Sequence, residues 1–176
     1  MHLTGGLFRH KTDTYFGGNA VSTKKRIMAL DIGDARIGVA LSDQLWITAQ
    51  PYATIERQGK SVLAVIDVIK EKDVGTVVVG IPYELSGAFG PQAKKVQEFA
   101  TEIHEACRRR KELQQVNFVF CDERMTTKQA QRVMIGSRLR NRQSSAALDQ
   151  IAATIILDSY MCSLGESSYQ TEQVAV

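Results

Sequence analysis

Four acidic residues of this chain stand where an ionised carboxylate needs a partner. Asp31 interrupts an apolar run, Asp122 and Glu123 follow a second apolar run, and Asp149 lies among small and apolar residues at helical spacing. A buried carboxylate is costly unless a cation or hydrogen-bond donors compensate its charge. Carboxylate oxygens suit Mg²⁺ or Mn²⁺, and two such ions can activate water and stabilise a leaving oxygen. The acids therefore predict a two-metal site for phosphodiester hydrolysis.

Each acid also has an ordinary structural interpretation. Asp31 stands next to a predicted turn and could accept main-chain hydrogen bonds there. Asp149 falls in the first turn of a predicted helix, where a carboxylate complements the helix dipole. Only one of the two adjacent acids can face a site directly, because neighbouring residues of an extended chain point to opposite sides. We favour Glu123 as the metal ligand and keep Asp122 as a second or alternate ligand.

A strongly basic segment separates the last two acids. Between Arg124 and Leu148 there is no Asp or Glu, and the six basic residues are Arg124, Lys128, Arg132, Arg138, Arg140 and Arg142. Such a segment attracts polyanions, so we predict that these side chains bind the backbone of a nucleic acid. The alternative is a solvated basic loop. A second basic cluster, at residues 108–111, closes a predicted helix, where cations favour the negative end of the helix dipole.

The composition fits one globular domain. With 176 residues and 44% apolar residue types, the chain can bury a proper core, and its net charge of +3 is mild. The three cysteines, Cys107, Cys121 and Cys162, are odd in number and far apart, which predicts reduced thiols. The three histidines are scattered, so a zinc site is not expected. No apolar run approaches a membrane span and no secretory signal is evident, so we expect a cytoplasmic protein with no membrane partner.

Hydrophobic periodicity predicts five strands and four helices. The expected strands are 27–32, 36–42, 52–55, 76–81 and 116–121, and the expected helices are 60–72, 92–110, 127–135 and 145–164. We expect a flexible extension at 1–24, a folded domain at 25–164 and a flexible tail at 165–176. A hairpin extended by βαβ crossovers gives an α/β fold, a mixed five-stranded sheet with helices on both faces. Ligands gather outside the carboxyl ends of such strands, where the acids fall, and Gly33 and Gly38 permit either a tight turn or a close main-chain approach.

Four motifs resemble the YqgF family, also called RuvX, of the ribonuclease H-like superfamily. They are ALDIGDARIGVALSD at 29–43, VVVGIPYELSGAFGPQAKKVQEFA at 77–100, FCDERMTTKQA at 120–130 and LDQIAATIILDSYM at 148–161. The resemblance implies a ribonuclease H-like fold and a nuclease with Asp31, Glu123 and Asp149 as its catalytic acids. Ser86 and Leu148 depart from the residues usual in the family, Asp and Val, and neither departure removes a proposed ligand.

The leading hypothesis is a metal-dependent endonuclease. Through the resemblance, its substrate would be the 5′ end of a 16S rRNA precursor, in ribosome biogenesis, or alternatively a Holliday junction in branched DNA. A non-catalytic nucleic-acid-binding module is a further alternative, although clustered acids would serve no purpose in it. An ATPase of the actin and hexokinase kind also carries a D-x-G turn like Asp31-Ile32-Gly33, but it needs a much longer chain. The sequence is compatible with a monomer or a homodimer, and with RNA or DNA as the substrate.

Overall fold

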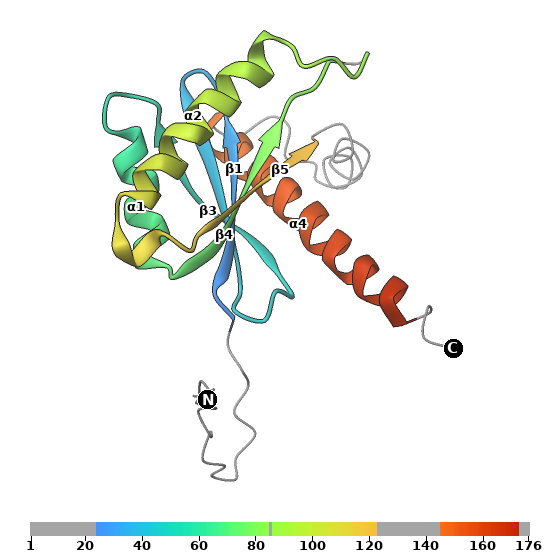
Figure 1. Ribbon diagram of the computed structural model, residues 1–176. Coiled ribbons are helices and arrows are strands. Elements are labelled where there is room, and N and C mark those ends of the chain that lie inside the picture. Colours follow the sequence, from blue (N-terminus) through green and yellow to red (C-terminus); the bar gives the residue numbers. More distant parts are fainter. Residues whose placement is uncertain (1–23, 85, 123–144, 173–176) are drawn as a thin grey trace, which may run out of the picture.

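The computed structural model describes residues 24–84, 86–122 and 145–172 (Figure 1). The elements are, in chain order, β1 (Arg26–Ile32), β2 (Arg36–Ser42), β3 (Ala49–Glu56), α1 (Ser61–Glu71), β4 (Val74–Ile81), α2 (Pro91–Arg108), η1 (Lys111–Leu113), β5 (Asn117–Asp122) and α4 (Ser145–Glu172). The expected helix at 127–135 and the expected extension at 1–24, except for Lys24, lie outside the described residues. Those two expectations, and the division into domain and tails that depends on them, stay predictions.

One five-stranded sheet forms the centre of the fold, in the order β3-β2-β1-β4-β5. β2 pairs antiparallel with β1 and with β3, whereas β4 pairs parallel with β1 and β5 pairs parallel with β4. The parallel pairs are joined through α1 and α2, because a parallel connection needs a long crossover. The predicted mixed sheet is confirmed, and β1 is its central strand.

Alternation along the strands divides the apolar core between the two faces of the sheet. In β1, Met28 and Leu30 pack with side chains of α1 and α2, whereas Ile27 and Ala29 pack with side chains of α4. Figure 1 shows α1 and α2 on one side of the sheet and the long α4 on the other. Because both faces are covered, β4 reads as a continuous apolar run rather than an alternating one. The expected helices on both faces are confirmed.

β3 and α4 extend furthest beyond the bounds that the sequence pattern predicts. β3 begins at Ala49 rather than near Tyr52, because Ala49 pairs with the last residue of β2, and Pro51 is tolerated since β3 is an edge strand. α4 continues to Glu172, past the expected end at Leu164, so the first residues of the expected tail are helical. A single Gly165 weakens a helix by only about 1 kcal/mol, which does not stop it. Within the described residues, no helix combines the length and apolarity needed to cross a membrane.

Candidate active site

Asp31 lies at the carboxyl end of the central strand. The side chains of Ile27 and Ala29 pack under α4, and strand alternation points Asp31 in the same direction. The residue is half-buried, and its register partner on β2 is Gly38. The carboxylate therefore projects from the sheet toward the face that α4 covers.

Gly38 allows α4 to approach the sheet at this point. A Cβ atom on Gly38 would overlap the main-chain carbonyl group of Asp149, so a larger residue would displace the helix. The tight turn belongs instead to Gly33, whose N–H donates to the carbonyl oxygen of Arg36 at 2.9 Å. Since Gly38 pairs with Asp31 and contacts Asp149, it brings the two acids to one place.

Polar contacts from β2 and β3 fix the first turn of α4. The Thr54 hydroxyl donates to the carbonyl oxygen of Ala146 at 2.8 Å and accepts from Nε2 of Gln150 at 3.1 Å. Arg36 Nε donates to Oδ2 of Asp149 at 2.7 Å, with both side chains partly buried. Asp149 is therefore held from two sides, through its main chain by the anchored turn and through its carboxylate by Arg36.

The two carboxylates interact electrostatically. Two effects together raise the pKa of Asp31 from its ordinary value of 3.8 to about 6: burial, which is the larger, and the negative charge of Asp149. Loss of water around a carboxylate and a like charge nearby both disfavour the ionised form. At neutral pH the site therefore holds two negative charges, of which the Arg36 guanidinium offsets one.

Arg36 is a member of this site that the sequence pattern does not predict. The pattern indicates only that Arg36 begins a strand, five positions after Asp31 and across the predicted turn. This position in a hairpin could have predicted that Arg36 lies near the acids, because it places the side chain beside the carboxyl end of the neighbouring strand. The hydrogen bond to Asp149 raises the pKa of Arg36 above its ordinary value, so the guanidinium stays charged.

Asp122 ends the edge strand β5, opposite Ile81 of β4. Cys121 packs with the residues under α4, whereas Phe118 packs with the core on the α1 and α2 side. Alternation therefore gives Asp122 the direction of Phe118, away from the face on which Asp31 lies. Of the four predicted acids, the structure brings together Asp31 and Asp149.

The remaining predicted site residues lie outside the described residues. They are Glu123, Arg124, Lys128, Arg132, Arg138, Arg140 and Arg142. Within residues 24–84, 86–122 and 145–172, no group of three or more His, Cys, Asp or Glu side chains is placed to hold a metal ion. The described part of the site is thus a pair of carboxylates with one guanidinium.

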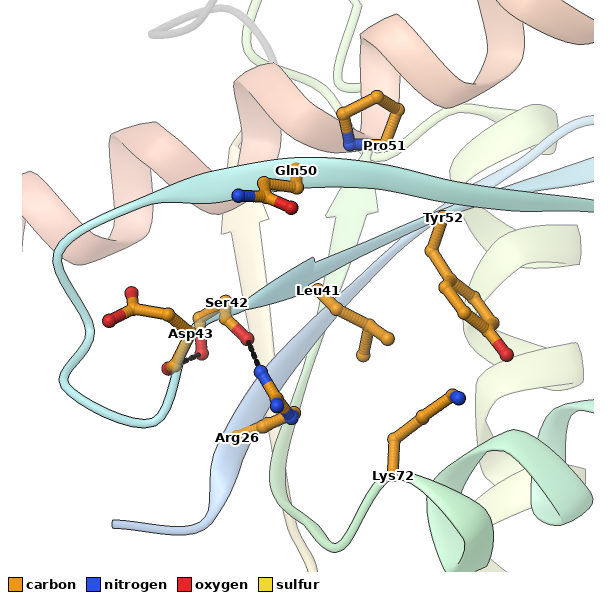
Figure 2. Close-up of a pocket in the computed structure, with 8 residues that line it drawn as sticks. All are labelled: Arg26, Leu41, Ser42, Asp43, Gln50, Pro51, Tyr52 and Lys72. Atoms are coloured by element: carbon orange, nitrogen blue, oxygen red, sulfur yellow. Dashed lines mark hydrogen bonds between the residues drawn. The ribbon is translucent and has the colours of Figure 1, made fainter. Parts of the chain in front are cut away.

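A surface hollow of about 340 Å³ lies at the other end of the sheet and is separate from this site. Figure 2 shows Arg26, at the start of β1, donating a hydrogen bond to the carbonyl oxygen of Ser42 at 2.7 Å. Lys72 lies beside the ring of Tyr52 and forms an ion pair with Glu71 at 2.7 Å. The cations of this hollow are therefore engaged within the protein, and Asp31 is not among its lining residues.

Comparison with known proteins identifies the family. The family model described as "RuvX: Holliday junction resolvase" matches residues 25–163. This chain belongs to the RuvX family. A RuvX relative from Roseiflexus sp. (strain RS-1), named "Putative pre-16S rRNA nuclease", is 39% identical over 138 residues, which are 77% of this chain and 93% of the relative. A relative of the same name from Caldanaerobacter subterraneus subsp. tengcongensis is 40% identical over 139 residues, 77% of this chain and 95% of that one.

The RuvX fold also resembles a solved structure. The T. thermophilus RuvC in complex with Holliday junction substrate superposes with a TM-score of 0.52 at 13% sequence identity, over 77% of this chain and 93% of that chain. At this identity the likeness bears on the fold alone, and it confirms the expected ribonuclease H-like sheet. The family match and the relatives' names confirm the expected RuvX membership and the expectation of a nuclease.

Proposed function

We propose that the chain is a metal-dependent endonuclease that hydrolyses phosphodiester bonds in 5′-end processing of a 16S rRNA precursor. The observation that carries the proposal is the pair of Asp31 and Asp149, which lie close enough for the charge of one to raise the pKa of the other. The Arg36 guanidinium offsets only one of the two charges, so a bound cation would relieve the repulsion that is left. A half-buried acid pair at the carboxyl end of parallel strands is therefore better explained by ligand binding than by packing.

The donor set suits a hard divalent cation. Asp31 and Asp149 would hold Mg²⁺ or Mn²⁺, with Glu123 as the third ligand. Two such ions would supply a polarised water for attack and charge stabilisation for the leaving oxygen. Arg36 occupies Oδ2 of Asp149 and leaves Oδ1 for a ligand, so it orients the carboxylate as well as neutralising it.

The preference for Glu123 over Asp122 follows from the direction of the described residues of β5. Cys121 lies on the α4 side and Asp122 points to the other side. One further residue of extended chain would return to the side of Asp31. This alternation supports Glu123 as the direct ligand.

The six basic residues between Arg124 and Arg142 complete the proposal as the phosphate-binding segment. They connect β5 to α4 in the sequence, between the acids Asp122 and Glu123 on one side and Asp149 on the other. A nucleic acid held there would present its backbone to the acids. Cleavage of branched DNA is the second candidate, because the matching family model is described as a Holliday junction resolvase.

The cysteines support a reducing compartment for this activity. Cys107, Cys121 and Cys162 form no disulfide bond, and Cys107 is buried. Disulfides form in oxidising compartments, so three cysteines without a disulfide favour the cytoplasm, where precursor rRNA is found. We place the enzyme there.

Cleavage assays on two substrates test the proposal. Wild type is compared with Asp31→Asn, Glu123→Gln and Asp149→Asn on a precursor rRNA 5′ leader and on a four-way DNA junction, with Mg²⁺ or Mn²⁺ titrated. We expect cation-dependent cleavage of the leader and its loss in all three variants. Cleavage that persists in a chelator, or variants as active as wild type, would refute the metal site.

Asp158→Asn is the matched control for these variants. Asp158 is an exposed acid on the same helix as Asp149. Asp158→Asn should cleave like wild type, because it removes the same charge from α4 but far from the end of the sheet where Asp31 lies.

The two substrates also decide between the two candidate functions. If wild type cleaves the four-way junction faster than the precursor rRNA leader, branched DNA is favoured as the substrate.

A further inference from the structure

The hollow between α2 and the edge strand β5 combines aromatic, amide and cationic side chains. Its volume is about 360 Å³, and the residues that carry its chemistry are Phe118, Phe120, His104, Arg108, Gln114 and Asn117. Among the described residues that line it, none is an Asp or a Glu. The hollow therefore offers surfaces for stacking, amide donors and acceptors, and positive charge, without an acid to repel a phosphate.

Phe120 is the least expected member of this group. The side chain is 46% exposed, and it lies on β5, at the edge of the sheet. Nearby, the rings of His104 and Phe118 lie with their centroids 4.9 Å apart, which continues the aromatic surface into the hollow. An exposed aromatic ring beside other rings is a platform on which a base can stack.

The cation of the hollow is Arg108, an exposed residue in the last turn of α2. The next residue, Arg109, pairs with Glu105 at 3.1 Å, whereas Arg108 lines the hollow. A guanidinium at this position can contact a phosphate next to a stacked base. The arrangement thus pairs a base site with a phosphate site.

Register relates this surface to the acids. Phe120 pairs with Val79, and Val79 pairs with Leu30, the residue before Asp31. Phe120 and Leu30 therefore lie level with each other on β5 and β1, with β4 between them. Their main chains are two strand spacings apart, roughly 10 Å. Phe120 has the direction of Leu30, toward α2, while Asp31 points toward α4. A strand of nucleic acid in contact with both must bend around the edge formed by β5.

We propose that the β5 edge, with Phe120 and Arg108, binds an unpaired strand of the nucleic-acid substrate that continues around the sheet edge to the proposed catalytic acids. Unpaired bases can be splayed and stacked on aromatic side chains, and a single strand bends readily over a sheet edge. A duplex has a persistence length of about 150 base pairs and does not bend on that scale without a deformation cost. The inference rests on the proposed nuclease function and specifies its substrate as a strand with unpaired nucleotides, such as a precursor leader.

Binding measured in EDTA tests the proposal without cleavage. Fluorescence anisotropy compares a short unstructured RNA with a blunt duplex, using the full chain. We expect Phe120→Ala to weaken binding of the unstructured RNA about tenfold with little change for the duplex, and Phe120→Trp to retain it. Arg108→Gln should lower the slope of log affinity against log salt by about 0.7 for the single strand.

Tyr52→Ala is the matched control. Tyr52 is an exposed aromatic residue on the other edge strand, β3, also beside a cation, Lys72 (Figure 2). It should bind both probes like wild type. Phe120→Ala with wild-type affinity for the single strand, or with equal losses for both probes, would overturn the proposal. So would a wild-type dimer that becomes a monomer in Phe120→Ala with RNA binding unchanged, since the edge would then join two copies of the chain.

The two proposals fail separately. Wild type that binds unpaired RNA through Phe120 but shows no cation-dependent cleavage of either substrate would refute the nuclease function and leave the binding surface. If Asp31→Asn abolishes cleavage while Phe120→Ala changes neither cleavage nor binding of the unstructured RNA, the proposed binding surface is refuted and the nuclease function is not.

Discussion

Asp31 carries an electrostatic penalty in the metal-free protein. Its folded-state pKa of about 6 lies above its ordinary value of 3.8, so between these values the folded protein binds more protons than the unfolded chain. Stability therefore falls as the pH rises from about 4 to about 6 and stays lower above that range. The residue that we propose for catalysis is thus one that the fold alone would not favour.

Asp31→Asn should stabilise the protein in EDTA. At neutral pH we expect the free energy of unfolding to rise by about 1–2 kcal/mol, less than the full shift of about 3 kcal/mol, since asparagine keeps a polar group half-buried. Urea denaturation at about pH 5 and about pH 8 measures the change, which should be larger at the higher pH. Mg²⁺ or Mn²⁺ should raise the midpoint of wild type but not of the variant. A variant less stable than wild type in EDTA would contradict the assigned penalty.

Arg36 acts through Asp149 and is a positioning residue. Arg36→Gln should lower the rate of cleavage and the affinity for the cation, each about 10- to 100-fold, as is usual when a partner of a metal ligand is removed. Arg36→Lys should restore part of the loss because it keeps the charge. Calorimetric titration with Mn²⁺ gives a reading independent of turnover. Arg26→Gln, at the opposite end of β1, is the control, and tighter cation binding in Arg36→Gln would show that Arg36 competes with the metal.

At the scale of elements, the site depends on how α4 sits on the β1–β2 hairpin. Asp31 and Asp149 belong to elements far apart in the sequence, and the contact of Gly38 with the Asp149 main chain sets their separation. Packed elements resist small displacements, so an added methyl group is not absorbed locally. The position of the helix therefore decides whether the two acids form one site.

Gly38→Ala should disrupt both stability and activity. The new Cβ overlaps the Asp149 carbonyl group, so we expect a loss of about 1–3 kcal/mol in urea denaturation, together with loss of cleavage. Gly59→Ala is a matched control, because a Cβ at Gly59 would meet no atom within 4 Å. Equal effects of the two substitutions would show that the contact between Gly38 and α4 is unimportant.

At the scale of the whole molecule, the charge that holds the substrate is predicted on the segment from Arg124 to Arg142. Replacing Arg138, Arg140 and Arg142 with Gln should reduce the slope of log affinity against log salt by about 2 for a single strand. The circular dichroism spectrum and the unfolding midpoint should stay close to those of wild type. Lys70→Gln, a change at an exposed cation on α1, is the control. An unchanged slope would show that these arginines do not bind the nucleic acid and would favour the alternative of a solvated basic loop.

Much of the architecture follows from hydrophobic periodicity. The apolar runs in β1 and β4 and the alternation in β2 predict strands, and the apolar residues at helical spacing in α4 predict a helix that packs on the sheet. The ends of elements were less predictable. β3 and α4 extend further than their patterns indicate, because strand pairing and the low penalty of one glycine decide where an element stops.

The sequence by itself determined which acids interrupt apolar surroundings, and hence that Asp31 and Asp149 needed a common explanation. Only the tertiary structure decided that they meet, that Gly38 sets their approach, and that Arg36 binds Asp149. The last contact joins residues 113 positions apart. A local pattern records how each element faces the core, whereas the pairing of two distant side chains depends on how helix and hairpin pack. The same packing leaves Phe120 exposed at the sheet edge, since strand order and not sequence period decides which strand is last.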